Sequence, residues 1–168
     1  GSKCPGQGDT LLLTTGQLQN AVHLHGRPVE GPAVIVGSEL VSWSAAMTLR
    51  EAGCRSPVMV TPHPRAEAYG AFTLTGRMAL GVDLRTRTRA TRILGHDRVE
   101  AVELLDLATG TRYLEPCRTV VFTGDWIPDH ELARLRGIEI DAAHRGPIVD
   151  AALRTSAPGV FAVGNVVH

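Results

Sequence analysis

The sequence predicts an α/β fold: a three-layer arrangement of a parallel sheet and flanking helices, with an antiparallel three-stranded meander. Residues 33–36 form a continuous apolar run, which is typical of a strand buried on both faces. Apolar residues at helical spacing follow over 40–49, and a second apolar run follows at 57–60. Together these segments indicate a strand–helix–strand unit with parallel strands. Between residues 85 and 120 the pattern changes to a period of two, which favours antiparallel strands.

Residues 1–30 read as a lead-in or linker that has no strong period. Its short apolar run at 11–13 could add an edge strand to the sheet. The segment 15–20 predicts the start of a short helix that ends near Gly26. Gly31 and Pro32 then close the lead-in with turn chemistry.

The first buried strand ends at Gly37, and Ser38 is a suitable N-cap for the helix that follows. That helix is expected to continue up to Gly53, which fits a helix C-terminus. After the second strand, a further helix is predicted over about residues 68–80, and residues 82–84 read as the next short strand.

The predicted meander has strands near 85–93, 99–106 and 113–114, joined by turns at 95–97 and 108–110. In this interpretation Arg85, Arg87 and Arg89 share one face of a strand, and a solvated sheet face is preferred over a polyanion-binding stripe. A buried strand follows at 119–122 and ends at Thr123-Gly124, before a short helix at 129–135.

Composition excludes several classes of protein. Lys and Arg number 17, as do Asp and Glu, so the net charge is zero, whereas a domain that binds nucleic acid should be basic. The three cysteines are far apart and form no C-x-x-C motif, which excludes a zinc ribbon and a local redox dithiol. No apolar run reaches the roughly 18 residues that span a bilayer. We therefore expect a soluble, cytoplasmic protein without a membrane partner or a metal site.

Three landmarks occur in order: the glycine turn at Gly37, the strand end at Thr123-Gly124, and the tail T-S-x-P-G-V-F-A-x-G-N at 155–165. With the meander between them, they resemble the pyridine nucleotide-disulfide oxidoreductase superfamily of FAD-dependent flavoproteins. The resemblance implies a Rossmann-like NAD(P)-binding-type domain at 31–150 and the start of the FAD domain's return segment at 151–168. The chain would then be a fragment of a longer flavoprotein. Because it has no C-x-x-C motif, it resembles the members of the superfamily that lack a redox disulfide.

The glycine fingerprint of a dinucleotide site is degraded. Such a site needs glycines because the backbone must approach the pyrophosphate at a helix N-terminus. The pattern G-x-G-x-x-G falls on residues 37–42, and its three glycine positions are Gly37, Glu39 and Ser42. Only the first is a glycine, and Ser38 lies between the first two. Ser42 is small enough for the third position, whereas Glu39 adds bulk and negative charge at the second. We hypothesise that the Glu39 carboxylate partly takes the place of the missing phosphate.

Two further cofactor contacts are expected. No acid follows the strand at 57–60 to hold the adenine ribose. Arg65 or His63 could meet a 2′-phosphate instead, so binding of NADPH is less disfavoured than binding of NADH. The alternative is an ordinary solvated loop. The resemblance also places Thr123 and Gly124 beside the cofactor, and assigns Gly164 and Asn165 to the FAD of the parent protein, with Asn165 where the family has Asp.

The expected function is that of a nucleotide-binding-type domain in an FAD-dependent NAD(P)H oxidoreductase, with the rest of the flavoprotein as its partner. The alternative is a scaffold or interface domain that no longer binds nicotinamide. No residue is a candidate catalytic acid, base or nucleophile, because in such proteins the cofactors supply the chemistry and the protein positions them.

Overall fold

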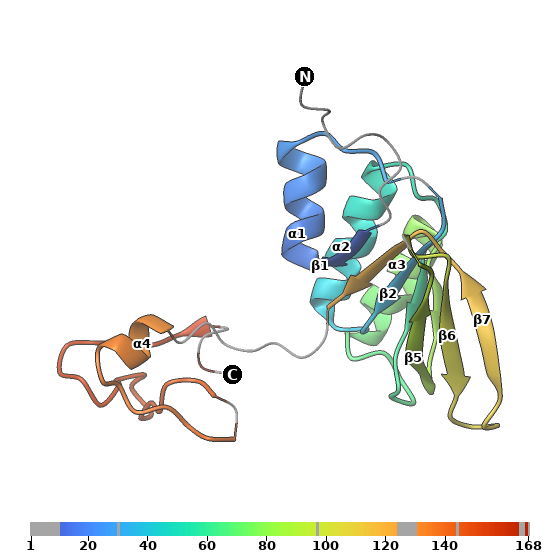
Figure 1. The fold of residues 1–168 in the computed structure, drawn as a ribbon. Coiled ribbons are helices and arrows are strands. Elements are labelled where there is room, and N and C mark those ends of the chain that lie inside the picture. The colour runs from blue at the N-terminus through green and yellow to red at the C-terminus, as the bar shows by residue number, and fades with distance from the viewer. Residues whose placement is uncertain are drawn as a thin grey trace. The chain divides into compact units, whose positions relative to one another are not determined.

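The computed structural model describes residues 11–29, 31–96, 98–123, 131–143, 145–164 and 167 (Figure 1). The chain divides into two compact units, Gly1–Gly124 and Asp125–His168. The α/β prediction is confirmed in the first unit, which contains a five-stranded parallel sheet and a separate three-stranded antiparallel sheet. The domain boundaries expected in the parent protein, at 30/31 and 150/151, stay predictions.

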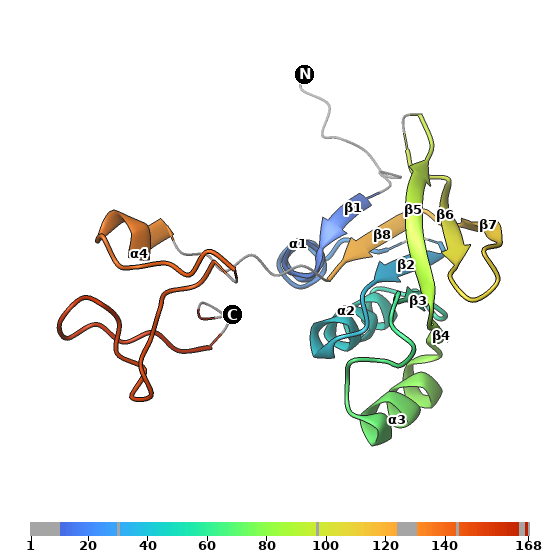
Figure 2. The same ribbon diagram turned by 90° about the horizontal axis from the view of Figure 1, so that it is seen from below.

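The parallel sheet has the strand order β1-β8-β2-β3-β4 (Figure 2). Its strands are β1 (Leu11–Thr14), β2 (Ala33–Val36), β3 (Val58–Val60), β4 (Asp83–Arg85) and β8 (Thr119–Phe122). The apolar run at the start of the chain therefore does form an edge strand, because β1 pairs with β8 from Leu11↔Thr119 to Thr14↔Phe122. β2 lies between β8 and β3, so the three strands share a common direction at the centre of the sheet.

Helices cover one face of this sheet, and the meander covers the other (Figure 2). The helices are α1 (Thr15–Gln19), which continues into a π-helix (Asn20–Leu24), α2 (Leu40–Glu51) and α3 (Gly70–Leu80). Alternation along β2 separates two hydrophobic clusters: Ile35 faces the helices and Val34 faces the meander. Cys54 belongs to the helical cluster and Cys117 to the meander cluster, so these two thiols lie on opposite sides of the sheet.

The meander consists of β5 (Thr88–Leu94), β6 (Ala101–Asp106) and β7 (Arg112–Pro116). The expectation that Arg85, Arg87 and Arg89 share one strand face is wrong. Arg85 ends β4 of the parallel sheet, Arg87 has a positive φ of 49° in the connection, and only Arg89 lies in β5. Arg85 instead joins the two sheets, since its Nη1 is 2.6 Å from Oε2 of Glu115 in β7.

The start of α2 also differs from the prediction. Glu39, not Ser38, is the N-cap residue, and its side chain accepts no hydrogen bond from the helix backbone. Ser38 is fully buried and its hydroxyl is engaged by Glu67, so it is not available to cap the helix. Gly53 follows the C-cap residue with φ 103°, which agrees with the predicted helix end.

The second unit contains α4 (Glu131–Leu135), followed by Gly137 with φ 67°. Isolated bridges join Ile140 to Pro147 and Arg154 to Phe161. None of the helices in the described part of the chain combines the length and apolar character that crossing a bilayer requires.

Trp43 of α2 packs directly against Gly76 of α3. The indole is fully buried, and a Cβ added to Gly76 would lie 2.8 Å from two of its ring carbons. The two helices can approach this closely because position 76 has no side chain. This contact accounts for a glycine in the interior of α3, because the indole leaves no room for a side chain there.

We predict that Gly76→Ala destabilises the protein even though alanine favours helices. Overpacking costs about 1–3 kcal/mol, whereas the gain in helix propensity is about 1 kcal/mol. The midpoint of urea denaturation measures the difference. Gly70→Ala in the same helix is the matched control, because a Cβ there meets nothing within 4 Å, and it should leave stability unchanged or raise it. Equal effects of the two substitutions would contradict the contact.

Candidate functional site

The carboxyl ends of β2, β3 and β8 meet at one edge of the parallel sheet. Val36 is in register with Val60 on one side and with Phe122 on the other. The residues that follow these strands therefore lie next to one another, and ligands bind at this edge in open α/β sheets. The candidate site consists of the turn Gly37–Glu39, the loop after β3, and Thr123.

Gly37 makes the tight turn that the sequence predicts for it. Its φ is 129°, a conformation that favours glycine, and its N–H donates to the carbonyl of Val60 at 2.9 Å. The turn is thus anchored to the neighbouring strand and directs the chain into α2.

Glu39 folds back onto two hydroxyl groups. Its Oε2 accepts a hydrogen bond from Ser42 Oγ at 2.7 Å and lies 3.1 Å from Thr123 Oγ1. The two hydroxyl oxygens are themselves 2.6 Å apart, and both residues are buried. Thr123 Oγ1 is also 3.1 Å from the carbonyl of Val36. These three side chains, which we call the carboxylate–hydroxyl cluster, join the end of β8 to the first turn of α2.

The carboxylate–hydroxyl cluster bears on the hypothesis that Glu39 stands in for a phosphate. A bound phosphate would accept from backbone N–H groups at the helix N-terminus. The Glu39 carboxylate instead accepts from side-chain hydroxyls, and no hydrogen bond joins it to the helix backbone. The backbone of the turn therefore has a carboxylate beside it that is bonded within the chain.

The loop between β3 and α3 is held against the glycine turn by Glu67. The Ser38 hydroxyl donates to Glu67 Oε2 and accepts from the Glu67 backbone N–H, both at 3.3 Å. His63 Nε2 lies 3.7 Å from the other carboxylate oxygen of Glu67. Arg65 is exposed in the same loop. Sequence reasoning looked for an acid directly after β3 and so missed Glu67, which only the fold of the loop brings back to the site.

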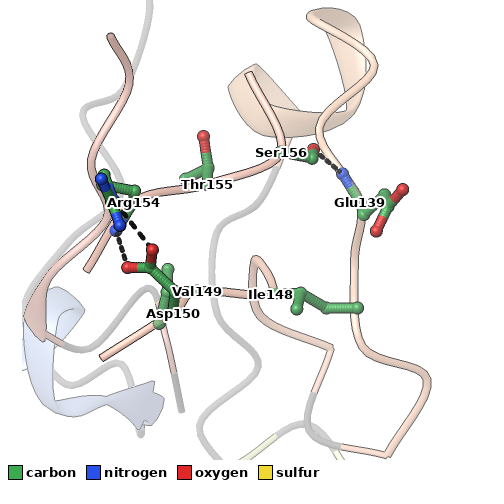
Figure 3. A pocket seen from close by; sticks show the side chains of 7 residues that line it. All are labelled: Glu139, Ile148, Val149, Asp150, Arg154, Thr155 and Ser156. Carbon is green, nitrogen blue, oxygen red and sulfur yellow. Dashed lines mark hydrogen bonds and ion pairs between the residues drawn. The ribbon is translucent and has the colours of Figure 1, made fainter. Parts of the chain in front are cut away.

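Gly164 in the tail has a φ of 77°, a conformation that favours glycine. Asn165 in the tail and Gly124 after β8 lie outside the described residues. The second unit has a shallow hollow of about 270 Å³ lined by Glu139, Ile148, Val149, Asp150, Arg154, Thr155 and Ser156 (Figure 3). Two pairs of its polar groups are bonded: Arg154 Nε donates to Asp150 at 2.8 Å, and the Glu139 N–H donates to Ser156 at 2.9 Å.

Comparison with known proteins identifies the family of this chain. A profile of the pyridine nucleotide-disulphide oxidoreductase family matches residues 2–168. The chain belongs to this family. The resemblance first seen in the glycine turn, the strand end and the tail is thereby confirmed for this oxidoreductase chain.

Relatives of this chain include proteins named as ferredoxin reductases. It is 35% identical over 188 residues to the biphenyl dioxygenase system ferredoxin–NAD(+) reductase component of Paraburkholderia xenovorans, covering 94% of this chain and 43% of the relative. It is 31% identical over 130 residues to a ferredoxin–NADP reductase of Frankia alni, covering 77% of this chain and 39% of the relative. The chain thus spans less than half the length of these curated relatives.

The fold of the oxidoreductase chain also matches solved structures. Thioredoxin reductase of T. acidophilum superposes with a TM-score of 0.77 at 22% identity, covering 95% of this chain and 50% of that one. At this identity the likeness shows the fold alone. Cys54 and Cys117 are both free, and each is buried in a different hydrophobic cluster.

We predict that Thr123→Val destabilises the protein by about 1–3 kcal/mol, because it removes a buried hydroxyl and leaves its partners short of a hydrogen bond. A double-mutant cycle with Glu39→Ala, followed by urea denaturation, should give a coupling free energy of about 0.5–3 kcal/mol. Thr75→Val is the matched control, since the Thr75 hydroxyl is exposed and bonds only within its own helix. Additive effects of the Thr123 and Glu39 substitutions would contradict the carboxylate–hydroxyl cluster.

We also predict that Cys117 resists alkylation at pH 8. Burial, and secondly the negative charge of Glu115, raise the pKa of its thiol from 9.0 to about 11. The folded chain thus holds the Cys117 proton more tightly than the unfolded chain does. The unfolded chain releases this proton first, so the free energy of unfolding decreases as the pH rises from 9.0 towards 11. Site-resolved mass spectrometry after iodoacetamide treatment should show labelling that increases over this range, and full labelling at pH 8 in denaturing urea. Rapid labelling of the native protein at pH 8 would contradict the burial.

Proposed function

We propose that this chain carries the NAD(P)-type nucleotide domain of an FAD-dependent oxidoreductase, with the pyrophosphate turn filled by its own Glu39. The observation that carries the proposal is the position of the Glu39 carboxylate, which bonds to Ser42 and Thr123 at the edge where the coenzyme's phosphates would lie. Family membership supports the oxidoreductase role, and it also supports FAD as the cofactor of the parent protein.

The parent protein would pass electrons between a nicotinamide coenzyme, FAD and a ferredoxin. This part of the proposal rests on the relatives, two of which are reductases of ferredoxin. The chain's partner is then the FAD domain of the same flavoprotein. Gly164 and Asn165 would contribute to the FAD site, and the positive φ of Gly164 is compatible with a close backbone approach there.

Charge decides how strongly Glu39 opposes a coenzyme. Two unit charges of the same sign at about 4 Å repel by roughly 4 kcal/mol at an effective dielectric constant near 20. That energy corresponds to about three decades of affinity. The hydrogen bonds of Glu39 to Ser42 and Thr123 must also be given up when a pyrophosphate enters. Coenzyme binding by the chain as it stands is therefore weak.

A second candidate function is a scaffold or interface domain that binds no nicotinamide. The observation in its favour is that the turn is complete without a ligand, since the Glu39 carboxylate already supplies the acceptor for both hydroxyls. The two functions predict different affinities for a nicotinamide coenzyme after Glu39 is replaced.

We predict that Glu39→Gly increases the affinity for NADH or NADPH, measured by isothermal titration calorimetry, by up to about 10³-fold. Glu39→Gln should recover only part of the gain, because it removes the charge and keeps the bulk. Glu51→Gln is the control, since Glu51 lies at the far end of the same helix and its side chain is 59% exposed.

Micromolar binding by the unaltered chain would contradict the filled turn. Absence of binding in every variant would favour the scaffold function.

A further inference from the structure

The loop after β3 brings a second carboxylate to the glycine turn. Glu67 is the residue concerned, and it is held through Ser38, which directly follows Gly37. Ser38 is fully buried, whereas the Glu67 side chain is 41% exposed. Glu67 is thus held at its backbone N–H and at one carboxylate oxygen by a buried hydroxyl, while its side chain remains partly open to solvent.

The position of this carboxylate relative to the strands is defined. The turn that carries Ser38 is bonded to the end of β3, because the Gly37 N–H donates to the carbonyl of Val60. In dinucleotide-binding folds the adenosine ribose lies between the glycine turn and the end of the second strand, where an acid accepts its 2′-hydroxyl. That acid is missing from the residues directly after β3, and Glu67 is the carboxylate that the structure brings to the same place.

We propose that Glu67 takes the role of the ribose-binding acid, and that the coenzyme of this site is NADH and not NADPH. The inference rests on the proposed function, because it requires a nicotinamide coenzyme to bind at this turn. It adds the choice of coenzyme, and it names as the determinant a residue outside the glycine fingerprint and the strand end.

Hydrogen-bond chemistry supports the assignment. A carboxylate accepts hydrogen bonds from hydroxyl groups and repels a phosphate. A carboxylate has two oxygens with about four acceptor sites, so Glu67 can accept a ribose hydroxyl and keep the hydrogen bond from Ser38. The backbone N–H of Glu67 also continues to hold the loop on Ser38.

Arg65 is the competing determinant, because a guanidinium at this place would accommodate a 2′-phosphate. Arg65 makes no hydrogen bond or ion pair with any residue that the structure describes, and it is exposed. Glu67 by contrast is anchored to the turn and faces Ser38 and His63. An anchored group retains its position when a ligand arrives, whereas a free arginine must lose side-chain entropy to bind. The structure therefore favours Glu67 over Arg65.

The experiment compares NADH and NADPH by calorimetry in the Glu39→Gly chain, where the turn is open. This chain should prefer NADH by about tenfold or more. Adding Glu67→Gln should weaken NADH about tenfold or more and strengthen NADPH, because a charge-assisted hydrogen bond is lost and a repulsion is removed. Adding Arg65→Ala should leave the ratio of the two affinities unchanged. Circular dichroism melting of each variant confirms that the chain is folded.

Two results would overturn the assignment of Glu67: an unchanged affinity ratio after Glu67→Gln, or a preference for NADPH that Arg65→Ala removes. Failure of both coenzymes to bind to every variant would instead overturn the proposed function, and this inference with it. The outcomes for the two proposals are therefore distinguishable.

Discussion

The contact between the Glu39 carboxylate and the hydroxyls of Ser42 and Thr123 determines what this edge of the sheet can do. It joins residues far apart in the sequence, and it exists only because β2 and β8 are neighbouring parallel strands that end together. Buried hydroxyls need partners, and here they receive them from within the chain. The hydroxyls beside the turn are consequently satisfied by the chain itself, and under the proposed function a coenzyme would have to compete with this internal acceptor.

The separate roles of cofactor and protein in this family explain why a turn that lacks the fingerprint glycines can be retained. Cofactors supply the redox chemistry, and the protein holds them in position and tunes their surroundings. A folded sheet with its helices and meander meets structural requirements that do not depend on the affinity of the turn. Changes at the glycine positions then alter coenzyme affinity without altering the hydrophobic clusters that stabilise the domain, since Ile35 and Val34 pack away from the turn.

The elements could be predicted from the sequence, because apolar runs and glycine breaks are local signals. Predictions that depend on tertiary contacts were less successful. Ser38 has the chemistry of an N-cap, yet its hydroxyl is occupied by Glu67, which no local pattern indicates. The arginine alternation suggested one strand, but the positive φ of Arg87 divides it between two sheets. The substitution at Glu39 was visible in the fingerprint and Thr123 was already a candidate site residue, whereas the contact between the two could be found only from the strand order.

Cys54 and Cys117 lie on opposite sides of the parallel sheet, and each is enclosed by apolar side chains of its own cluster. The two residues are only 4% and 2% exposed, so an oxidant in solution reaches neither thiol while the domain is folded. Formation of a disulfide by this pair therefore requires the domain to open first, so that oxidation of the pair would report on opening of the fold.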